Sequence, residues 1–166
     1  MINQLLNDHK INEVEIYNLL SSLSGTGSDY SDLYFQHSVA ESWMLDEGIV
    51  KDGSYNISHG VGARCVSGDK TGFSYSDDLN LKAIQGAVDF AKGISSSKPH
   101  SSPKLLKSTN YPSKYSAISP LDSLTSEQKV DLLRQINTMA RKEPKVVQVR
   151  ASLSGAYPEV LIASTD

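Results

Sequence analysis

The sequence has one cysteine, no surplus of basic residues and no long apolar run. A single Cys among 166 residues cannot form an internal disulfide, which excludes disulfide-stabilised secreted scaffolds. Its 16 Lys and Arg against 19 Asp and Glu give a formal net charge of −3, which argues against a general nucleic-acid binder. No apolar run approaches the roughly 20 residues of a bilayer-spanning helix. The N-terminus also lacks the basic and apolar regions of a signal peptide. We therefore expect a soluble, cytoplasmic protein without membrane association.

The composition is that of a folded globular protein. Hydrophobic residues make up 39% and charged residues 21% of the chain, so wholesale disorder is not expected. A chain of 166 residues suits one domain, or one domain and a small part of another. Composition alone indicates no activity.

Helical periodicity predicts three helices. The first covers residues 12–23, with Asn12 as its N-cap. A second covers residues 79–94, for which Asp77 or Asp78 is a suitable N-cap. The third begins at Thr125, which forms a capping box with Gln128, and ends before Pro144. Its expected apolar stripe consists of Val130, Leu132, Leu133, Ile136, Met139 and Ala140.

Alternation of polar and apolar residues predicts short strands joined by tight turns. The expected turns lie at residues 46–48, at Asp52-Gly53, at residues 67–70 and at residues 155–158. The fold class predicted is α+β: an antiparallel β-meander packed with about three helices and ending in a β-hairpin. Residues 95–120 are expected to form an exposed Ser/Pro-rich loop. The expected strands are residues 33–39, 41–45, 49–51, 60–66, 71–75, 146–154 and 160–165.

No catalytic constellation can be assembled from the residues. The four His are scattered, and none pairs with a second His or with the Cys at metal-ligand spacing. Cys65 alternates with apolar residues, which favours a small buried side chain over a reactive thiolate. Gly68-Asp69-Lys70-Thr71 resembles the end of a P-loop, but an Asp interrupts it and a strand follows it, so a hairpin turn is the better interpretation.

A sheet of short strands suggests one binding mode. An edge strand can accept an extended peptide through main-chain hydrogen bonds, and glycines in a strand let another backbone approach closely. On this basis Gly60, Arg64 and Gly72 are the candidate peptide-contacting residues. No catalytic residue and no metal ligand is predicted in this chain.

Several blocks of the sequence resemble one known family. These blocks are residues 30–36 (YSDLYFQ), 41–43 (ESW), 49–57 (IVKDGSYNI), 60–64 (GVGAR), 67–75 (SGDKTGFSY), 118–125 (ISPLDSLT) and 149–166. Through them the chain closely resembles the N-terminal domain of the TldD/PmbA (TldE) metalloprotease family, also described as modulators of DNA gyrase. The resemblance covers nearly the whole chain, and only the segment around residues 95–103 departs from it noticeably.

The resemblance implies a bacterial, cytoplasmic, zinc-dependent peptidase that acts as a heterodimer with a TldE (PmbA)-like subunit. Such enzymes cleave extended or unfolded peptides, in peptide maturation, leader removal and antitoxin degradation. The family holds its zinc with an H-E-x-x-x-H motif and a later Cys. No His-Glu pair occurs in this sequence, so no catalytic residue carries over. We therefore expect residues 1–166 to be an N-terminal domain truncated before the catalytic domain and inactive alone. Its role would be to shape the peptide channel and the subunit contacts.

Two other interpretations stay open. The chain could be a stand-alone peptide-binding or assembly module without protease activity. It could also be an enzyme that uses Cys65, which would then react rapidly with iodoacetamide in the folded chain.

Overall fold

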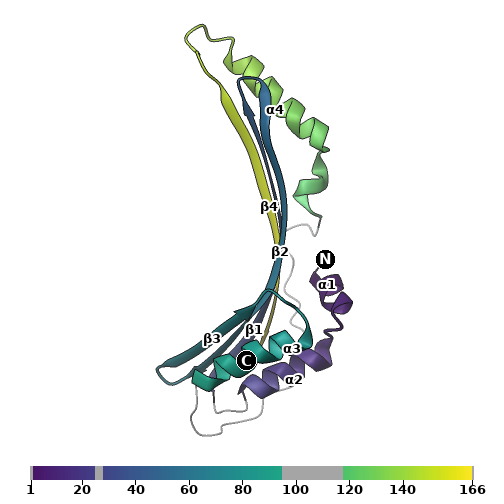
Figure 1. The fold of residues 1–166 in the computed structure, drawn as a ribbon, viewed down its shortest axis with the longest axis vertical. Helices are drawn as coiled ribbons and strands as arrows, with labels where there is room; N and C mark the ends of the chain where they lie inside the picture. The colour runs from purple at the N-terminus through teal and green to yellow at the C-terminus, as the bar shows by residue number, and fades with distance from the viewer. Residues whose placement is uncertain (1, 25–27, 95–117, 166) are drawn as a thin grey trace. The chain divides into compact units, whose positions relative to one another are not determined.

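The computed structural model describes residues 2–24, 28–94 and 118–165. Its elements are α1 (Ile2–Asp8), α2 (Glu13–Ser24), β1 (Tyr30–Asp46), β2 (Ile49–Ser67), β3 (Lys70–Ser76), α3 (Leu81–Ile94), the 3-10 helix η1 (Pro120–Ser123), α4 (Ser126–Ala140) and β4 (Arg150–Ser164). The strands form one antiparallel sheet in the order β3-β2-β1-β4 (Figure 1). The α+β class is confirmed. The predicted loop at 95–120 lies almost entirely outside the described residues, and α1 was not predicted.

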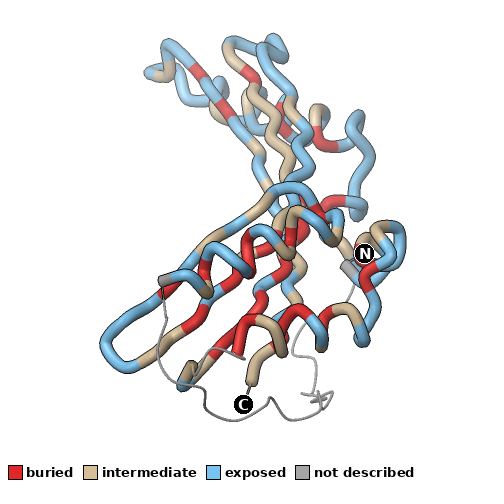
Figure 2. Tube along the Cα trace, turned by 60° about the horizontal axis from the view of Figure 1, so that its bottom comes forward, coloured by how far each residue is buried: buried red, intermediate tan, exposed pale blue. Residues whose placement is uncertain are grey.

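The chain divides into two compact units, each with its own core. Unit 1 comprises Met1–His37, Ser58–Tyr111 and Glu159–Asp166, and unit 2 comprises Ser38–Ile57 and Pro112–Pro158. In unit 1, α2 and α3 pack together and α3 also packs on β3. The buried residues of this unit concentrate on the helices and on the strands that they cover (Figure 2). In unit 2, Leu133 of α4 packs against Leu45 of β1 and Ala151 of β4.

The helix starts follow from side-chain caps. Asn12 caps α2, because its Oδ1 accepts the N–H groups of Val14 and Glu15 at 2.9 and 3.0 Å. The predicted cap of α3 is wrong: Asn80, rather than Asp77 or Asp78, accepts the N–H of Ala83 at 2.8 Å. Asp78 instead accepts the N–H of Asn80 at 3.0 Å and so shapes the turn that precedes the helix.

The capping box of α4 is confirmed, but its predicted apolar stripe is not buried as a whole. Thr125 and Gln128 satisfy each other's backbone N–H groups. Leu133 is fully buried, whereas Leu132, Ile136 and Met139 are 39%, 44% and 67% exposed. The helix instead buries Lys129, which finds its partners in unit 2.

The strands are longer than predicted, because two predicted turns do not exist. β1 runs unbroken through both strands expected between residues 33 and 45, and the first turn is the pair Glu47-Gly48 with φ of 53° and 78°. Asp52-Gly53 lies inside β2. Gly53 is there for close packing, since a Cβ at that position would lie 3.2 Å from two ring atoms of Trp43.

The C-terminal segment is one strand where two were predicted. The turn expected at residues 155–158 lies inside β4, which extends from Arg150 to Ser164. A Cβ on Gly155 would lie 2.7 Å from Leu121 Cδ2, so this glycine permits a close approach rather than a turn. Pro158 is tolerated because β4 is an edge strand of the sheet, where a missing N–H is not needed for pairing.

Candidate functional site

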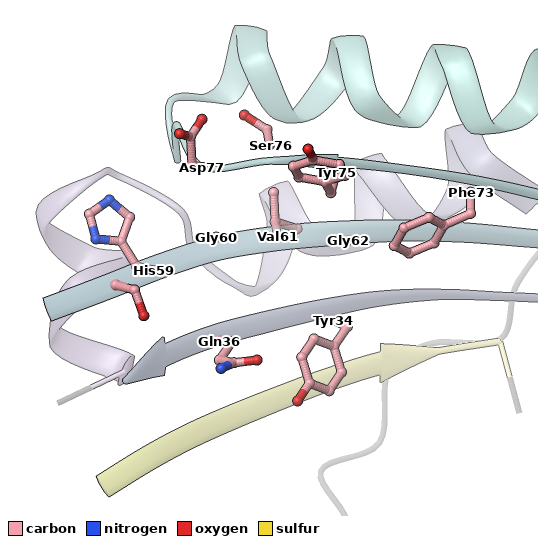
Figure 3. A pocket seen from close by; sticks show the side chains of 11 residues that line it. Tyr34, Gln36, His59, Gly60, Val61, Gly62, Phe73, Tyr75, Ser76 and Asp77 are labelled. Carbon is pink, nitrogen blue, oxygen red and sulfur yellow. The ribbon is translucent and has the colours of Figure 1, made fainter. Parts of the chain in front are cut away.

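Unit 1 has a pocket on the sheet face opposite α2 and α3. It has a volume of about 400 Å³. Strands β1, β2 and β3 and the residues directly after β3 supply its walls (Figure 3). The lining residues are Tyr34, Gln36, Ser58, His59, Gly60, Val61, Gly62, Phe73, Tyr75, Ser76 and Asp77.

Strand alternation places the aromatic residues on this open face. Leu33 and Phe35 are buried under the helices, so Tyr34 between them points the other way. The register of β2 and β3 pairs Gly62 with Tyr75 and Arg64 with Phe73, so these residues share a face. Phe73 and Tyr75 are consequently 56% and 77% exposed, although both are large aromatic side chains.

The glycines of β2 make room for the pocket. A Cβ on Gly62 would lie 3.2 Å from Cε2 of Phe73, so the Phe73 ring lies across the strand where a side chain would otherwise stand. A Cβ on Gly60 would lie 3.0 Å from the carbonyl oxygen of Ser76. The absence of side chains at these two positions therefore admits the Phe73 ring and the backbone of Ser76 close to β2.

Next to the pocket, Arg64 is held by Asp32. Its Nε donates to Asp32 Oδ2 at 2.8 Å, and its guanidinium lies 5.3 Å from the centre of the Tyr30 ring. The hydrogen bond to Asp32 raises the pKa of Arg64, and burial, with a further contribution from Asp32, raises the pKa of Tyr30. The positive charge of Arg64 is therefore already matched by an acidic partner.

Of the three predicted peptide-contact residues, one lines the pocket and two do not. Gly60 lines the pocket, whereas Arg64 and Gly72 are not among its lining residues. Gly72 pairs with Cys65 and is buried on the helix-covered face. The aromatic residues were not predicted, although a tyrosine at a polar position of an alternating strand is a usable signal.

The other candidate residues that the structure describes form neither a reactive thiol site nor a metal site. Cys65 is fully buried, and its Sγ lies 3.7 Å from the carbonyl oxygen of Leu23, so the thiol is not accessible. Within residues 2–24, 28–94 and 118–165, no three His, Cys, Asp or Glu side chains come together as metal ligands would. His9 and His59 lie with ring centres 6.3 Å apart, and His100 falls outside the described residues.

In unit 2, the acidic pair Asp46-Glu47 accepts hydrogen bonds from the start of β4 and from the end of α4. Glu47 accepts the N–H of Val149 at 2.7 Å and a hydrogen bond from Arg141 at 2.7 Å, and these partners lower its pKa in that order. The pKa of Asp46 is lowered mainly by its hydrogen bond from Arg150. This role is the structural one expected for acidic residues at a turn.

None of the helices in the described part of the chain has the length and apolarity needed to cross a bilayer.

Comparison with known proteins identifies clear relatives. The family description "PmbA/TldA metallopeptidase domain 1" matches residues 31–95. A "Metalloprotease TldD homolog" of Haemophilus influenzae is 44% identical over 167 residues, which cover 99% of this chain and 35% of that protein. The homolog of Buchnera aphidicola subsp. Schizaphis graminum is 40% identical over 163 residues, covering 98% of this chain and 34% of that protein. The chain thus spans about a third of the length of these curated relatives.

Solved structures share the fold at low sequence identity. A putative modulator of a DNA gyrase from Thermotoga maritima superposes with a TM-score of 0.71 at 16% identity, covering 92% of this chain and 35% of that one. TldE from Thermococcus kodakarensis gives a TM-score of 0.63 at 16% identity, covering 90% and 35%.

Proposed function

This chain belongs to the PmbA/TldD metallopeptidase family through its first domain, and from that premise we propose that it is the non-catalytic domain of a metal-dependent peptidase. The full-length protein would cleave extended or unfolded peptides, with roles in peptide maturation, leader removal and antitoxin degradation. This domain would shape the peptide channel and contribute to subunit contacts.

One observation carries the proposal: 44% identity over 99% of the chain to a protein named a metalloprotease. The same relative is almost three times as long as the matched region, which covers 35% of it. A chain that matches about a third of a protein named a metalloprotease is expected to serve the same overall reaction as that protein.

The proposal assigns the metal chemistry to residues outside this chain. The resemblance implies zinc held by an H-E-x-x-x-H motif, and this sequence contains no His-Glu pair. The described residues do not fit a zinc site either, because no three potential ligands come together. The proposal therefore assigns the activation of water to a metal and a general base that lie outside this chain.

A TldE-like subunit is the proposed protein partner, and the bacterial cytoplasm the proposed location. The likeness of the fold to TldE supports the first. The resemblance to the family supports the second. Contact with peptide is assigned to the open face of unit 1, where aromatic side chains and glycines line one pocket. No nucleic acid or membrane takes part in the proposal.

The test compares this chain with the full-length protein. Fluorescently labelled unfolded casein is incubated with the 166-residue chain, with the full-length protein, and with that protein plus its TldE-like partner. We expect cleavage by the full-length protein with its partner, loss of cleavage with a chelator, and recovery with added zinc. Metal-dependent proteolysis by the chain alone that survives repurification would contradict the proposal.

The second candidate is a stand-alone peptide-binding module. The observation that favours it is the pocket itself, whose lining comes entirely from unit 1. The reading frame after Asp166 separates the two: a stop codon supports the module, and an encoded His-Glu-x-x-x-His supports the peptidase. The proposal that uses Cys65 is disfavoured, because that side chain is fully buried.

A further inference from the structure

We propose that the pocket of unit 1 binds an extended peptide segment carrying a large apolar side chain next to a positive charge. The class of ligand, a peptide, rests on the proposed function. The side chains that the pocket prefers are the new inference. The residues that line the pocket all belong to unit 1.

The size and lining of the pocket suit one large apolar side chain. Tyr34, Phe73 and Tyr75 contribute aromatic side chains that are 38%, 56% and 77% exposed. Three exposed aromatic side chains around a volume of about 400 Å³ leave apolar area that a ligand can remove from water. Figure 3 shows Tyr34 on β1 and Phe73 and Tyr75 on β3, the two strands that flank the glycines of β2.

The glycines determine where the Phe73 ring lies. A Cβ on Gly62 would lie 3.2 Å from Cε2 of Phe73, so this ring covers the glycine. A Cβ on Gly60 would lie 3.0 Å from the carbonyl oxygen of Ser76, so the backbone after β3 covers that position. A ligand therefore meets the exposed Phe73 ring, together with Tyr34 and Tyr75, as the apolar surface of the pocket.

Charge determines the second part of the preference. Among the lining residues Asp77 is the one with a formal charge at pH 7, counting His59 as neutral. Asp77 is exposed, and its side-chain carboxylate forms no hydrogen bond or ion pair with another described residue. The nearby Arg64 does not line the pocket and is already paired with Asp32. The unmatched carboxylate complements a Lys or Arg side chain, or a terminal ammonium group, beside the apolar residue.

Binding of short labelled peptides to this chain tests the proposal. The probes are fluorescein-labelled Gly-Ser-Phe-Lys-Ser-Gly and the same peptide with Phe-Glu or Ala-Lys at its centre, measured by fluorescence anisotropy. We expect Ala-Lys to bind about tenfold more weakly than Phe-Lys, because the apolar side chain is lost. Phe-Glu should bind several-fold more weakly, and this difference should shrink in about 0.5 M salt. Equal binding of the three peptides would overturn the proposal.

Variants with matched controls locate the site. Tyr75→Ser and Asp77→Asn should weaken binding of the Phe-Lys peptide, and Asp77→Asn should also remove its advantage over Phe-Glu. The controls are Phe90→Ser, which removes a 68% exposed Phe from α3, and Asp69→Asn, which removes an exposed charge from the β2–β3 turn. Both controls should bind as the original chain does. Equal loss in a control and its matched variant would show non-specific adhesion and overturn the proposal.

Two further measurements distinguish this inference from a dimer formed through the same face and from the proposed peptidase function. If the face instead joined two copies of this chain, sedimentation would show a dimer that Tyr75→Ser dissociates, and the peptide proposal would be overturned. Metal-dependent casein cleavage by the full-length protein tests the proposed function independently. Continued cleavage with unselective peptide binding would reject this inference alone, whereas selective binding without metal-dependent cleavage would reject only the peptidase.

Discussion

Lys129 shows how a charged side chain can be part of a small core. Its side chain is 8% exposed, and its Nζ lies 2.6 Å from Glu41 Oε1 and 2.6 Å from the carbonyl oxygen of Leu121. A buried ammonium group is tolerated only when such partners compensate for its lost hydration. The pair links α4 to β1 and to the segment before the helix.

Removing one partner of this buried pair should destabilise the protein more than removing one partner of an exposed ion pair. We expect Lys129→Met to lower the free energy of unfolding by about 3 kcal/mol, because Glu41 keeps a buried charge without a counter-charge. The double variant with Glu41→Leu should recover most of the loss. Urea unfolding followed by Trp43 fluorescence measures both.

Arg134→Met provides the control, since Arg134 and Asp131 form a pair in which both side chains are 60% exposed. Its effect should stay within about 0.5 kcal/mol. A Lys129 variant no less stable than this control would contradict the prediction.

Glu47 should make part of the stability depend on pH. The N–H of Val149 and then Arg141 lower its pKa in the folded protein below the ordinary value. The stabilisation is therefore present above the unfolded pKa and is lost as the pH falls from about 5 through the lowered folded pKa. Thermal unfolding of the original chain and of Glu47→Gln should differ at neutral pH and converge in acid. A difference that stays constant with pH would contradict this.

At the scale of the elements, glycines that look alike in sequence have opposite roles. Gly86 lies within α3 and has nothing within 4 Å of where its Cβ would stand. Gly155 lies within β4, and its Cβ would stand 2.7 Å from the Leu121 side chain. A helix interior favours alanine over glycine, whereas a tight contact between packed segments does not.

The same substitution should thus change stability in opposite directions at the two sites. Gly86→Ala should stabilise the chain by about 0.5–1 kcal/mol. Gly155→Ala should destabilise it by about 1 kcal/mol or more, because Leu121 must move aside. Chemical unfolding measures both, and combining Gly155→Ala with Leu121→Ala should reduce the additional cost of the alanine. Equal effects at the two positions would contradict the packing argument.

Some sequence patterns were sufficient to predict helix starts and strand faces, and others were not sufficient to predict turns. Helix caps and strand alternation depend on neighbours within a few residues, so the caps Asn12 and Thr125 and the two faces of β1 could be predicted. The turns predicted at Asp52-Gly53 and at residues 155–158 could not be excluded in the same way. The glycines at these positions, Gly53 and Gly155, pack closely against Trp43 and Leu121, which are not their neighbours in sequence.

At the scale of the whole molecule, the two units differ greatly in their cores. Among the described residues, the core cluster of unit 1 has 16 buried members, whereas that of unit 2 has Leu45, Leu133 and Ala151. A smaller buried apolar core provides less stability. Unit 2 is therefore expected to unfold at lower urea concentration than unit 1.

The single tryptophan makes this measurable. Trp43 packs against the core of unit 2, so its fluorescence reports on that unit, whereas far-UV circular dichroism also reports on α1, α2 and α3 of unit 1. The fluorescence transition should come at lower urea than the circular dichroism transition. Leu133→Ala should widen the gap, because it removes a fully buried side chain from the smaller core. Coincident transitions in both proteins would contradict the prediction.

By itself the sequence determined the α+β class, the helix starts at Asn12 and Thr125, the turn at residues 46–48 and the resemblance to a metallopeptidase family. Each depends on local spacing or on blocks of consecutive residues. Only the tertiary structure decided that Gly60 and not Gly72 faces the pocket, that Phe73 and Tyr75 are exposed together, and that Lys129 is buried. The physical reason is that burial and close approach depend on which distant segments meet, and no local pattern encodes that.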